Sequence, residues 1–222
     1  MARADKLVDD LRSAIIRGQF ADGQPLRQDE IAKAFGTSKI PVREALRQLE
    51  GEGLVDSIPN RGIVVSKMSE AELNEICEIR IDLETRALRL AIPRLDTATL
   101  KAAENILDAT ERDPDYLSTW SGRNWAFHNT LYAPAERPLL LRMIEDLHRK
   151  TERYLQMHVS MFQYRDRGQA EHRAILDACK RRDSAAAVRL LKAHITDVAT
   201  MLAPHLMQRD VRSRYTFVPR QM

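Results

Sequence analysis

The sequence predicts a mainly α-helical protein with two domains. Apolar residues recur at helical spacing along most of the 222-residue chain, and one short segment, around residue 60, has the pattern of paired strands. Glycine usage changes along the chain, because six of the eight glycines fall at or before Gly62. We therefore expect a small N-terminal domain of three helices and a two-stranded β ribbon over residues 1–68, followed by an all-α bundle over residues 69–222.

Two helices are expected before residue 36. The first is marked by apolar residues at helical spacing that end at a glycine: Leu7, Leu11, Ala14, Ile15 and Gly18. The second covers residues 26–35 (LRQDEIAKAF), and Gly36 then provides a turn. A short turn between this helix and the next one is typical of a helix-turn-helix.

The third helix begins near Ser38. Ser38, or Thr37 before it, can accept a hydrogen bond from the first free backbone N–H groups, and Pro41 falls in the first turn, where its missing N–H costs nothing. One face of this helix is apolar and can pack on a small core; it consists of Val42, Ala45, Leu46 and Leu49.

Cations occupy the opposite face of the third helix. Lys39, Arg43 and Arg47 stand four residues apart, so they share one side of the helix. Such a stripe is also found on ordinary solvated helices, so it does not establish DNA binding by itself.

A hairpin pattern follows the third helix. Asn60-Arg61-Gly62 separates Val55 from the apolar run at residues 63–65, which predicts the wing of a winged helix. The turn, the helix before it and the wing after it together favour DNA binding. The candidate DNA contacts are Ser38, Lys39, Arg43, Arg47, Arg61 and Gly62.

Short motifs run through this domain: Leu26-x-x-x-Glu30-Ile-Ala, Gly36-Thr-Ser38, Pro41-Val-Arg43-Glu-Ala-Leu, Leu49-Glu, Gly53-Leu-Val and Arg61-Gly62. Over roughly residues 5–66 they resemble the winged-helix domain of the GntR family of bacterial transcription regulators. The family usually has Arg where this chain has Lys39. That difference keeps the charge but loses the bidentate guanidinium fork, so the resemblance implies altered base reading at this position.

Composition argues against several other classes of protein. No apolar run approaches the roughly 18 residues of a membrane span, and the charged N-terminus is unlike a signal peptide. Cys77 and Cys179 form no metal-type cluster, as expected of reduced thiols in a cytoplasmic protein. The net charge of +3 comes from the tail beyond residue 204, so the first domain is basic on one helix face and at the wing, not overall.

The second domain is predicted to be a bundle of about six helices. Their expected ranges are 69–91, 96–111, 115–133, 137–163, 168–181 and 184–203, with breaks near Pro93, Pro114, Pro134 and Gly168. Ser69 and Glu72, three residues apart, form a capping-box pattern at the start of the first one. The arginine-bearing tail after Pro204 could either pack across a dimer or extend freely.

Four polar residues of the bundle are candidates for its interior. Asn124 and His128 are four residues apart and point the same way from one helix, while His172 and His194 lie beside apolar positions of two further helices. Three imidazoles and one amide oxygen could hold a divalent transition metal with a coordination position left open. Because a histidine on an apolar face is more often a hydrogen-bonded core residue, the spacing alone leaves both interpretations open.

Further motifs extend the resemblance: Glu78-Ile-Arg80-x-x-x-Glu84, Asn124-x-x-Phe-His128-x-x-Leu-Tyr, Glu171-His172-x-x-Ile-Leu-x-Ala and Asp183…Ala187…His194. Across nearly all of residues 69–203 they resemble the FCD ligand-binding domain of FadR-type GntR regulators. The resemblance implies a metal such as zinc or nickel, bound by an acidic residue and three histidines, with an organic acid completing the coordination. Asn124 stands where Asp is more typical, which removes one negative charge from the site.

Arg80 has two interpretations. It comes directly after Ile79 on a helix whose buried face is expected to be marked by Ile76, Ile79 and Leu83. An ion pair with Glu84, four residues on, would stabilise a surface helix only modestly. A guanidinium fork for an effector carboxylate is the interpretation that the family pattern favours.

The leading hypothesis is a ligand-responsive transcription regulator. It would bind a palindromic operator as a homodimer, dimerise through its helical domain and sense a small carboxylate. A regulator that senses the metal itself is the second hypothesis. A metal-dependent hydrolase is disfavoured, because no His-Glu-x-x-His motif or nucleophile elbow is present and Glu171 is the only nearby candidate base. The sequence does not distinguish repression from activation.

Overall fold

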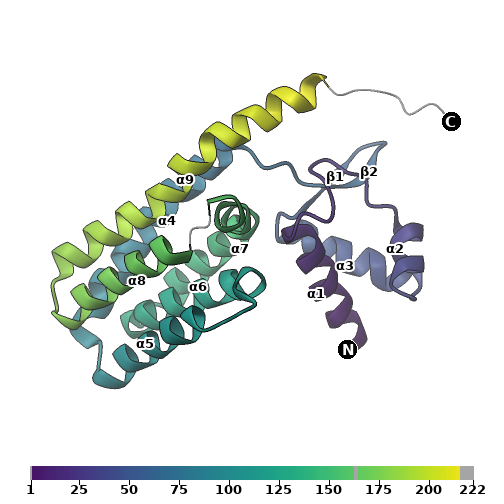
Figure 1. Ribbon diagram of the computed structural model, residues 1–222. Coiled ribbons are helices and arrows are strands. Elements are labelled where there is room, and N and C mark those ends of the chain that lie inside the picture. Colours follow the sequence, from purple (N-terminus) through teal and green to yellow (C-terminus); the bar gives the residue numbers. More distant parts are fainter. Residues whose placement is uncertain (1, 163–164, 216–222) are drawn as a thin grey trace. The chain divides into compact units, whose positions relative to one another are not determined.

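The computed structural model describes residues 2–162 and 165–215. The chain forms two compact units, Met1–Met68 and Ser69–Met222 (Figure 1). Both units have the predicted fold class: helices with one small sheet in the first, and helices throughout the described part of the second. Within that described part of the chain, no helix is both long and apolar enough to cross a membrane.

The first unit is a winged helix-turn-helix, as predicted. Its elements are α1 (Ala2–Ile16), α2 (Gln28–Ala34), α3 (Lys39–Gly51), β1 (Val55–Ile58) and β2 (Gly62–Val65). The strands pair antiparallel, from Val55 opposite Val65 to Ile58 opposite Gly62. Apolar side chains from all three helices and both strands form one core, which includes Leu11, Ile15, Ile31, Val42, Leu46, Leu49, Val55 and Val65.

The wing is anchored by a segment that the sequence pattern did not identify. Residues 23–26 run alongside β2: Gly23 donates its N–H to the Val65 carbonyl at 2.8 Å, and Leu26 donates to the Ile63 carbonyl at 2.8 Å. At the tip, Asn60 (φ 64°) and Gly62 (φ 75°) have left-handed backbone angles, which Asn and Gly adopt at low cost. The base of the wing is therefore fixed on both sides, while Arg61 is presented at the exposed tip.

The second unit consists of α4 (Glu70–Ala91), η1 (Ile92–Arg94), α5 (Thr97–Glu111), α6 (Tyr116–Tyr132), η2 (Ala133–Ala135), α7 (Pro138–Phe162), α8 (Arg165–Lys180) and α9 (Ser184–Tyr215). Helices α4 and α9 lie side by side (Figure 1). Helix α4 also packs against α6 and α7, and α8 packs against α5 and α9. The interior is thus bounded by helices that are far apart in sequence.

Two helix limits differ from the prediction. Helix α8 begins at Arg165, so Gly168 lies inside it and is not a break; a glycine inside a helix costs only about 1 kcal/mol, which the packing of its neighbours offsets. Helix α9 does not end at residue 203 but continues through Pro204 to Tyr215. Proline removes one backbone donor and bends a helix without requiring it to stop. The side chains of the tail from residue 207 lie outside the described residues.

The capping box at the start of α4 forms only in part. The Ser69 hydroxyl accepts from the Glu72 N–H at 3.3 Å, as predicted. The Ser69 N–H instead donates to the hydroxyl of Tyr154 on α7 at 2.9 Å, and that hydroxyl donates to the Glu72 carboxylate at 2.7 Å. A tyrosine from another helix therefore replaces the direct contact between Glu72 and the Ser69 backbone.

Candidate metal site and DNA-binding surface

Helix α3 presents its predicted cationic face to solvent. Its apolar face, Val42, Ala45, Leu46 and Leu49, is buried, which leaves Lys39, Arg43 and Arg47 exposed on the other side. Arg61 and Gly62 are exposed at the wing. Ser38 is the N-cap residue of α3, as expected, but its side chain does not make the expected capping hydrogen bond. Its hydroxyl is consequently not used by the helix.

Two features of this surface were not anticipated from the sequence. Lys39 forms an ion pair with Asp29 of α2, with 2.6 Å between Nζ and Oδ1, although both side chains are about two-thirds exposed. Ile40 is 63% exposed in the first turn of α3, beside the cations. The end of the helix thus offers an apolar side chain and a partly neutralised cation.

Three of the predicted metal ligands converge inside the second unit. His128, His172 and His194 come from α6, α8 and α9, and one potential ligand atom from each lies within 4.8 Å of the others. All three side chains are buried. The Nε2 atoms of His128 and His172 are buried without any hydrogen-bond partner. A buried polar atom without a partner is costly, so the lone pairs of these two nitrogens are suited to binding a metal ion.

The other ring nitrogen of each histidine faces an oxygen atom. The Nδ1 distances are 3.2 Å to the Tyr132 hydroxyl for His128, 3.4 Å to Gln169 Oε1 for His172 and 2.8 Å to Glu171 Oε2 for His194. An oxygen partner at Nδ1 favours the tautomer that carries its proton there and leaves the Nε2 lone pair free. This arrangement is common behind metal-bound histidines.

The charge state of the cluster also suits ligation. Burial, together with repulsion from the neighbouring imidazoles, lowers the pKa of His128 and of His172 well below the ordinary value. Both rings are therefore neutral near pH 7, as a metal ligand must be. Asn124 is buried one turn before His128 on α6, which is consistent with a place beside the three imidazoles.

Arg80 is buried in an ion pair, and its surroundings differ from the expectation. Its Nε lies 2.6 Å from Oε1 of Glu84, and the two side chains are 2% and 0% exposed. The buried stripe of α4 includes Arg80 and Glu84 themselves, whereas Ile79, expected on that face, is 41% exposed. The prediction of Ile79 as a core position is wrong, because the stripe follows positions 73, 76, 77, 80, 84 and 87.

His148 of α7 completes this interior and was missed by the sequence reasoning. Its Nε2 lies 2.9 Å from Nη2 of Arg80 and 3.4 Å from Oε1 of Glu84, and its ring centroid is 5.9 Å from that of His128. The signal was available, because His148 shares one helical face with Ile144, Thr151 and Leu155, all of which are buried. A cavity of about 90 Å³ between α6 and α7 reaches His148 and Trp125.

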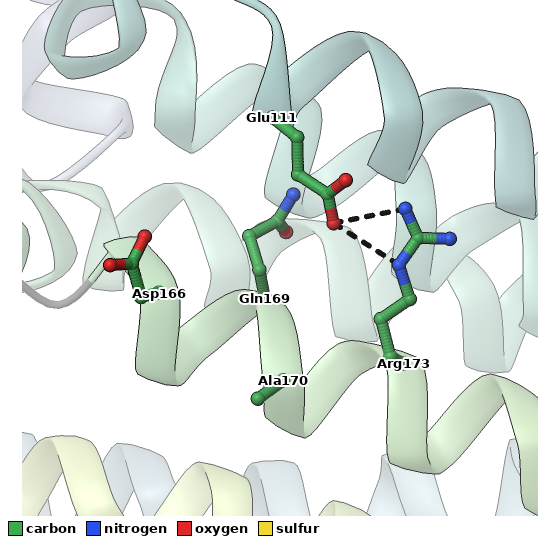
Figure 2. A pocket seen from close by; sticks show the side chains of 5 residues that line it. All are labelled: Glu111, Asp166, Gln169, Ala170 and Arg173. Carbon is green, nitrogen blue, oxygen red and sulfur yellow. Dashed lines mark hydrogen bonds and ion pairs between the residues drawn. The ribbon is translucent and has the colours of Figure 1, made fainter.

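A larger surface pocket, of about 420 Å³, lies where α8 meets the end of α5 (Figure 2). Two of its charged lining residues, Arg173 and Glu111, bind each other, and Arg173 also binds Asp108 beside the pocket. Gln169 connects this pocket to the histidine cluster: its amide N–H donates to the Leu107 carbonyl at 3.0 Å, which turns its oxygen toward His172. Gln169 therefore holds His172 from the side of this pocket. Arg173 is already paired with two carboxylates, so its charge is not available to a ligand.

Known proteins match both units. The profile of bacterial regulatory proteins of the gntR family matches residues 3–65, and that of the FCD domain matches residues 75–197. The HTH-type transcriptional repressor GlaR of Escherichia coli K12 is 31% identical over 83% of this chain and 89% of its own. A probable D-xylose utilization operon transcriptional repressor of Paenarthrobacter nicotinovorans is 32% identical over 86% and 85%.

Solved structures agree with this assignment. A GntR-family transcriptional regulator from Pseudomonas syringae pv. tomato is 30% identical, with a TM-score of 0.57 over 95% of this chain and 89% of that one. McbR/YncC of E. coli, at 24% identity, shares the fold with a TM-score of 0.71 over 94% and 99%. The chain therefore belongs to the GntR family of bacterial regulatory proteins, in the group whose second domain is an FCD domain.

Proposed function

We propose that this protein is a transcriptional repressor that binds a palindromic operator as a homodimer and responds to a small organic acid at a metal site in its helical domain. The observation that carries the sensing part is the convergence of His128, His172 and His194 with two buried Nε2 atoms that have no partner. Repression is supported by the relatives GlaR and the D-xylose operon regulator, both named as repressors.

Four side chains would hold the metal: the three imidazoles and the amide oxygen of Asn124. All are neutral ligands, a set that suits zinc or nickel. A bound divalent ion would supply concentrated positive charge that attracts a carboxylate oxygen. The protein's task is to keep the imidazoles neutral, oriented and shielded from water, which the burial and the Nδ1 contacts described above favour.

The charge of the interior favours an anionic effector. Arg80 and Glu84 offset each other, so a divalent ion held by neutral ligands leaves the region positively charged, and Glu171 behind His194 offsets only part of that charge. A mono- or dicarboxylate would reduce this positive charge. Its second contact would be Arg80, whose guanidinium it would share with Glu84 and His148. The cavity at His148, about 90 Å³, favours a small ligand.

Operator recognition is assigned to α3 and the wing. Lys39, Arg43 and Arg47 would reach base edges or phosphates in the major groove, and Arg61 with Gly62 would meet the adjacent backbone or minor groove. The exposed Ile40 suits apolar contact with a thymine methyl group. One such module covers only a short half-site, which is why a two-fold dimer and a palindromic operator are proposed.

The test uses the full-length protein and an operator selected from random DNA duplexes. Its affinity is measured by fluorescence anisotropy after chelation, after loading with Zn²⁺ or Ni²⁺, and after adding mono-, di- and tricarboxylates. We expect operator release only when metal and a carboxylate are both present. A response to neither metal nor acid would overturn the sensing proposal while leaving DNA binding intact.

A second candidate is direct metal sensing, without an organic effector. The observation in its favour is that Arg80 is already engaged by Glu84 and His148, so an incoming carboxylate must compete for it. Release of the operator by metal alone in the same titration would identify this function. Neither proposal requires catalysis, and Glu171 lies behind His194, hydrogen-bonded to its Nδ1.

A further inference from the structure

A buried chain of hydrogen bonds connects the ion pair on α4 to the histidine cluster. Tyr132 donates its hydroxyl hydrogen to Oε2 of Glu84 at 2.7 Å, and the same hydroxyl oxygen lies 3.2 Å from Nδ1 of His128. The side chains of all three residues are 0% exposed. Water therefore does not compete for these contacts.

The direction of each hydrogen bond in this chain follows from the chemistry of Arg80. A guanidinium can only donate, so Oε1 of Glu84 accepts from it at 2.6 Å. The ionised carboxylate can only accept, so Tyr132 must donate to Oε2. The Tyr132 oxygen is then left to accept the proton on Nδ1 of His128, and the lone pair of His128 is on Nε2.

We propose that Glu84 is a positioning residue for the metal site. Acting through Tyr132, it selects the tautomer of His128 that leaves the Nε2 lone pair free for a metal. This inference rests on the proposed metal site and deepens it, because it assigns a role to residues that would not touch the ion.

Replacing Glu84 by Gln gives the sharpest test, because it reverses the chain. Arg80 still needs an acceptor, so the amide oxygen of Gln faces Arg80 and the amide N–H faces Tyr132. Tyr132 then accepts from Gln and donates to Nδ1 of His128. The proton of His128 moves to Nε2, where it blocks ligation.

The same domain holds a matched control. Tyr154 donates to Oε2 of Glu72 at 2.7 Å, the same Glu–Tyr contact, and Glu72 lies in the first turn of α4, about three helical turns before Glu84. Glu72→Gln and Tyr154→Phe therefore change the same chemical groups away from the proposed site. A loss of metal affinity confined to Glu84 and Tyr132 variants would not be a general effect of losing a Glu–Tyr pair.

The experiment measures Co²⁺ affinity of the full-length protein by competition with a chelator, and records the visible absorption of bound Co²⁺. Glu84→Gln is expected to weaken Co²⁺ binding about 10- to 100-fold, the range typical of such supporting residues, and to alter the spectrum. Glu72→Gln should bind as the wild type does. Thermal melting of each metal-free variant checks that it is folded.

Tyr132→Phe keeps the Arg80–Glu84 pair intact, so it provides a second test if Glu84→Gln folds poorly. It should also weaken Co²⁺ binding, and the double variant should be little weaker than Glu84→Gln alone, since the two residues act in series. If wild-type protein binds Co²⁺ but Glu84→Gln and Tyr132→Phe bind equally well, the inference is overturned and the metal site stands. If the wild type does not bind Co²⁺, the metal site itself is wrong.

Discussion

Arg80 and Glu84 form an ion pair one helical turn apart on α4, with 2.6 Å between Nε and Oε1 and both side chains excluded from water. Burial alone would raise the pKa of Glu84, but attraction to Arg80 and then to His148 outweighs it and holds that pKa well below its usual range. The carboxylate is consequently ionised at neutral pH. Removing one member of the pair would leave the other as a buried charge without a partner, which should lower the stability of the protein.

Arg80→Ala should destabilise the protein by about 3–5 kcal/mol, because it leaves the Glu84 charge buried without its partner. The double replacement Arg80→Met and Glu84→Met should cost much less, since it removes both charges and keeps the volume. Urea denaturation of the second unit's transition measures both. Arg89→Ala, at an exposed position of the same helix, is the control and should change stability by less than about 0.5 kcal/mol. Equal losses for Arg80→Ala and Arg89→Ala would contradict the argument.

Local patterns were sufficient to predict the helix-turn-helix, the wing and most helix limits, because apolar spacing and turn residues determine them. Helical spacing placed His128, His172 and His194 beside apolar positions but left their convergence open, since they lie on three separate helices; the family motifs favoured it. His148 and the Tyr132–Glu84 contact depend on how α4, α6 and α7 pack, which spacing along one helix does not specify. The ion pair of Arg80 with Glu84 was one of two interpretations of the sequence, but its complete burial was not foreseen, because it depends on how the other helices cover α4.

Stability of the metal-free protein should fall as the pH drops below about 6.5. Burial, followed by repulsion from Arg80, lowers the pKa of His148 to about 4. The unfolded chain takes up a proton near the ordinary pKa of about 6.5, while the folded one does not, so stability is fully present above that pH and is lost toward pH 4. His148 alone accounts for roughly 3 kcal/mol over this window.

The measurement is urea denaturation in a chelator between about pH 7 and pH 5. His128 and His172 contribute in the same direction, because their pKa values are also lowered. Glu84 does not contribute in this window, because a carboxyl with a lowered pKa loses its effect only below its ordinary value near 4.3. In His148→Gln the free energy of unfolding should depend less steeply on pH. An unchanged pH dependence would show that His148 is not a source of the effect.

The pair between Lys39 and Asp29 should limit operator affinity. Asp29→Asn removes a negative charge on α2 beside the first residue of α3 and frees Lys39. Operator affinity should therefore rise, and the plot of log affinity against log salt should become steeper by the equivalent of about one phosphate contact. Arg43→Ala should instead cost about 1–3 kcal/mol if Arg43 reads a guanine. Anisotropy titrations at several salt concentrations measure both, with Arg89→Ala as the charge-matched control. Unchanged binding by Arg43→Ala at fixed salt would exclude Arg43 from the interface.

Dimerisation should be a property of the second unit. Its residues form their own compact unit and can therefore be tested alone. Under the proposed two-fold dimer, residues 69–222 expressed alone should dimerise, whereas residues 1–66 should be monomeric. Sedimentation at micromolar concentration distinguishes these outcomes. A monomeric helical fragment would rule out dimerisation through the second unit alone.

The histidine cluster makes the last prediction, which separates a metal site from a polar core. His172→Ala combined with His194→Ala should abolish binding of Zn²⁺ or Ni²⁺ and the response to carboxylates, but should leave operator binding in place, because the DNA-binding residues belong to the other unit.

Asn124→Asp is the complementary change: a carboxylate adds the negative charge that the amide lacks and should tighten metal binding. Calorimetry with each metal, together with operator titrations, measures these effects. If Asn124→Asp left the affinity unchanged while the double alanine variant abolished it, Asn124 would not be a ligand. If the double alanine variant still bound metal and responded to effector as the wild type does, the imidazoles would be core residues, and the unpartnered Nε2 atoms would need another explanation.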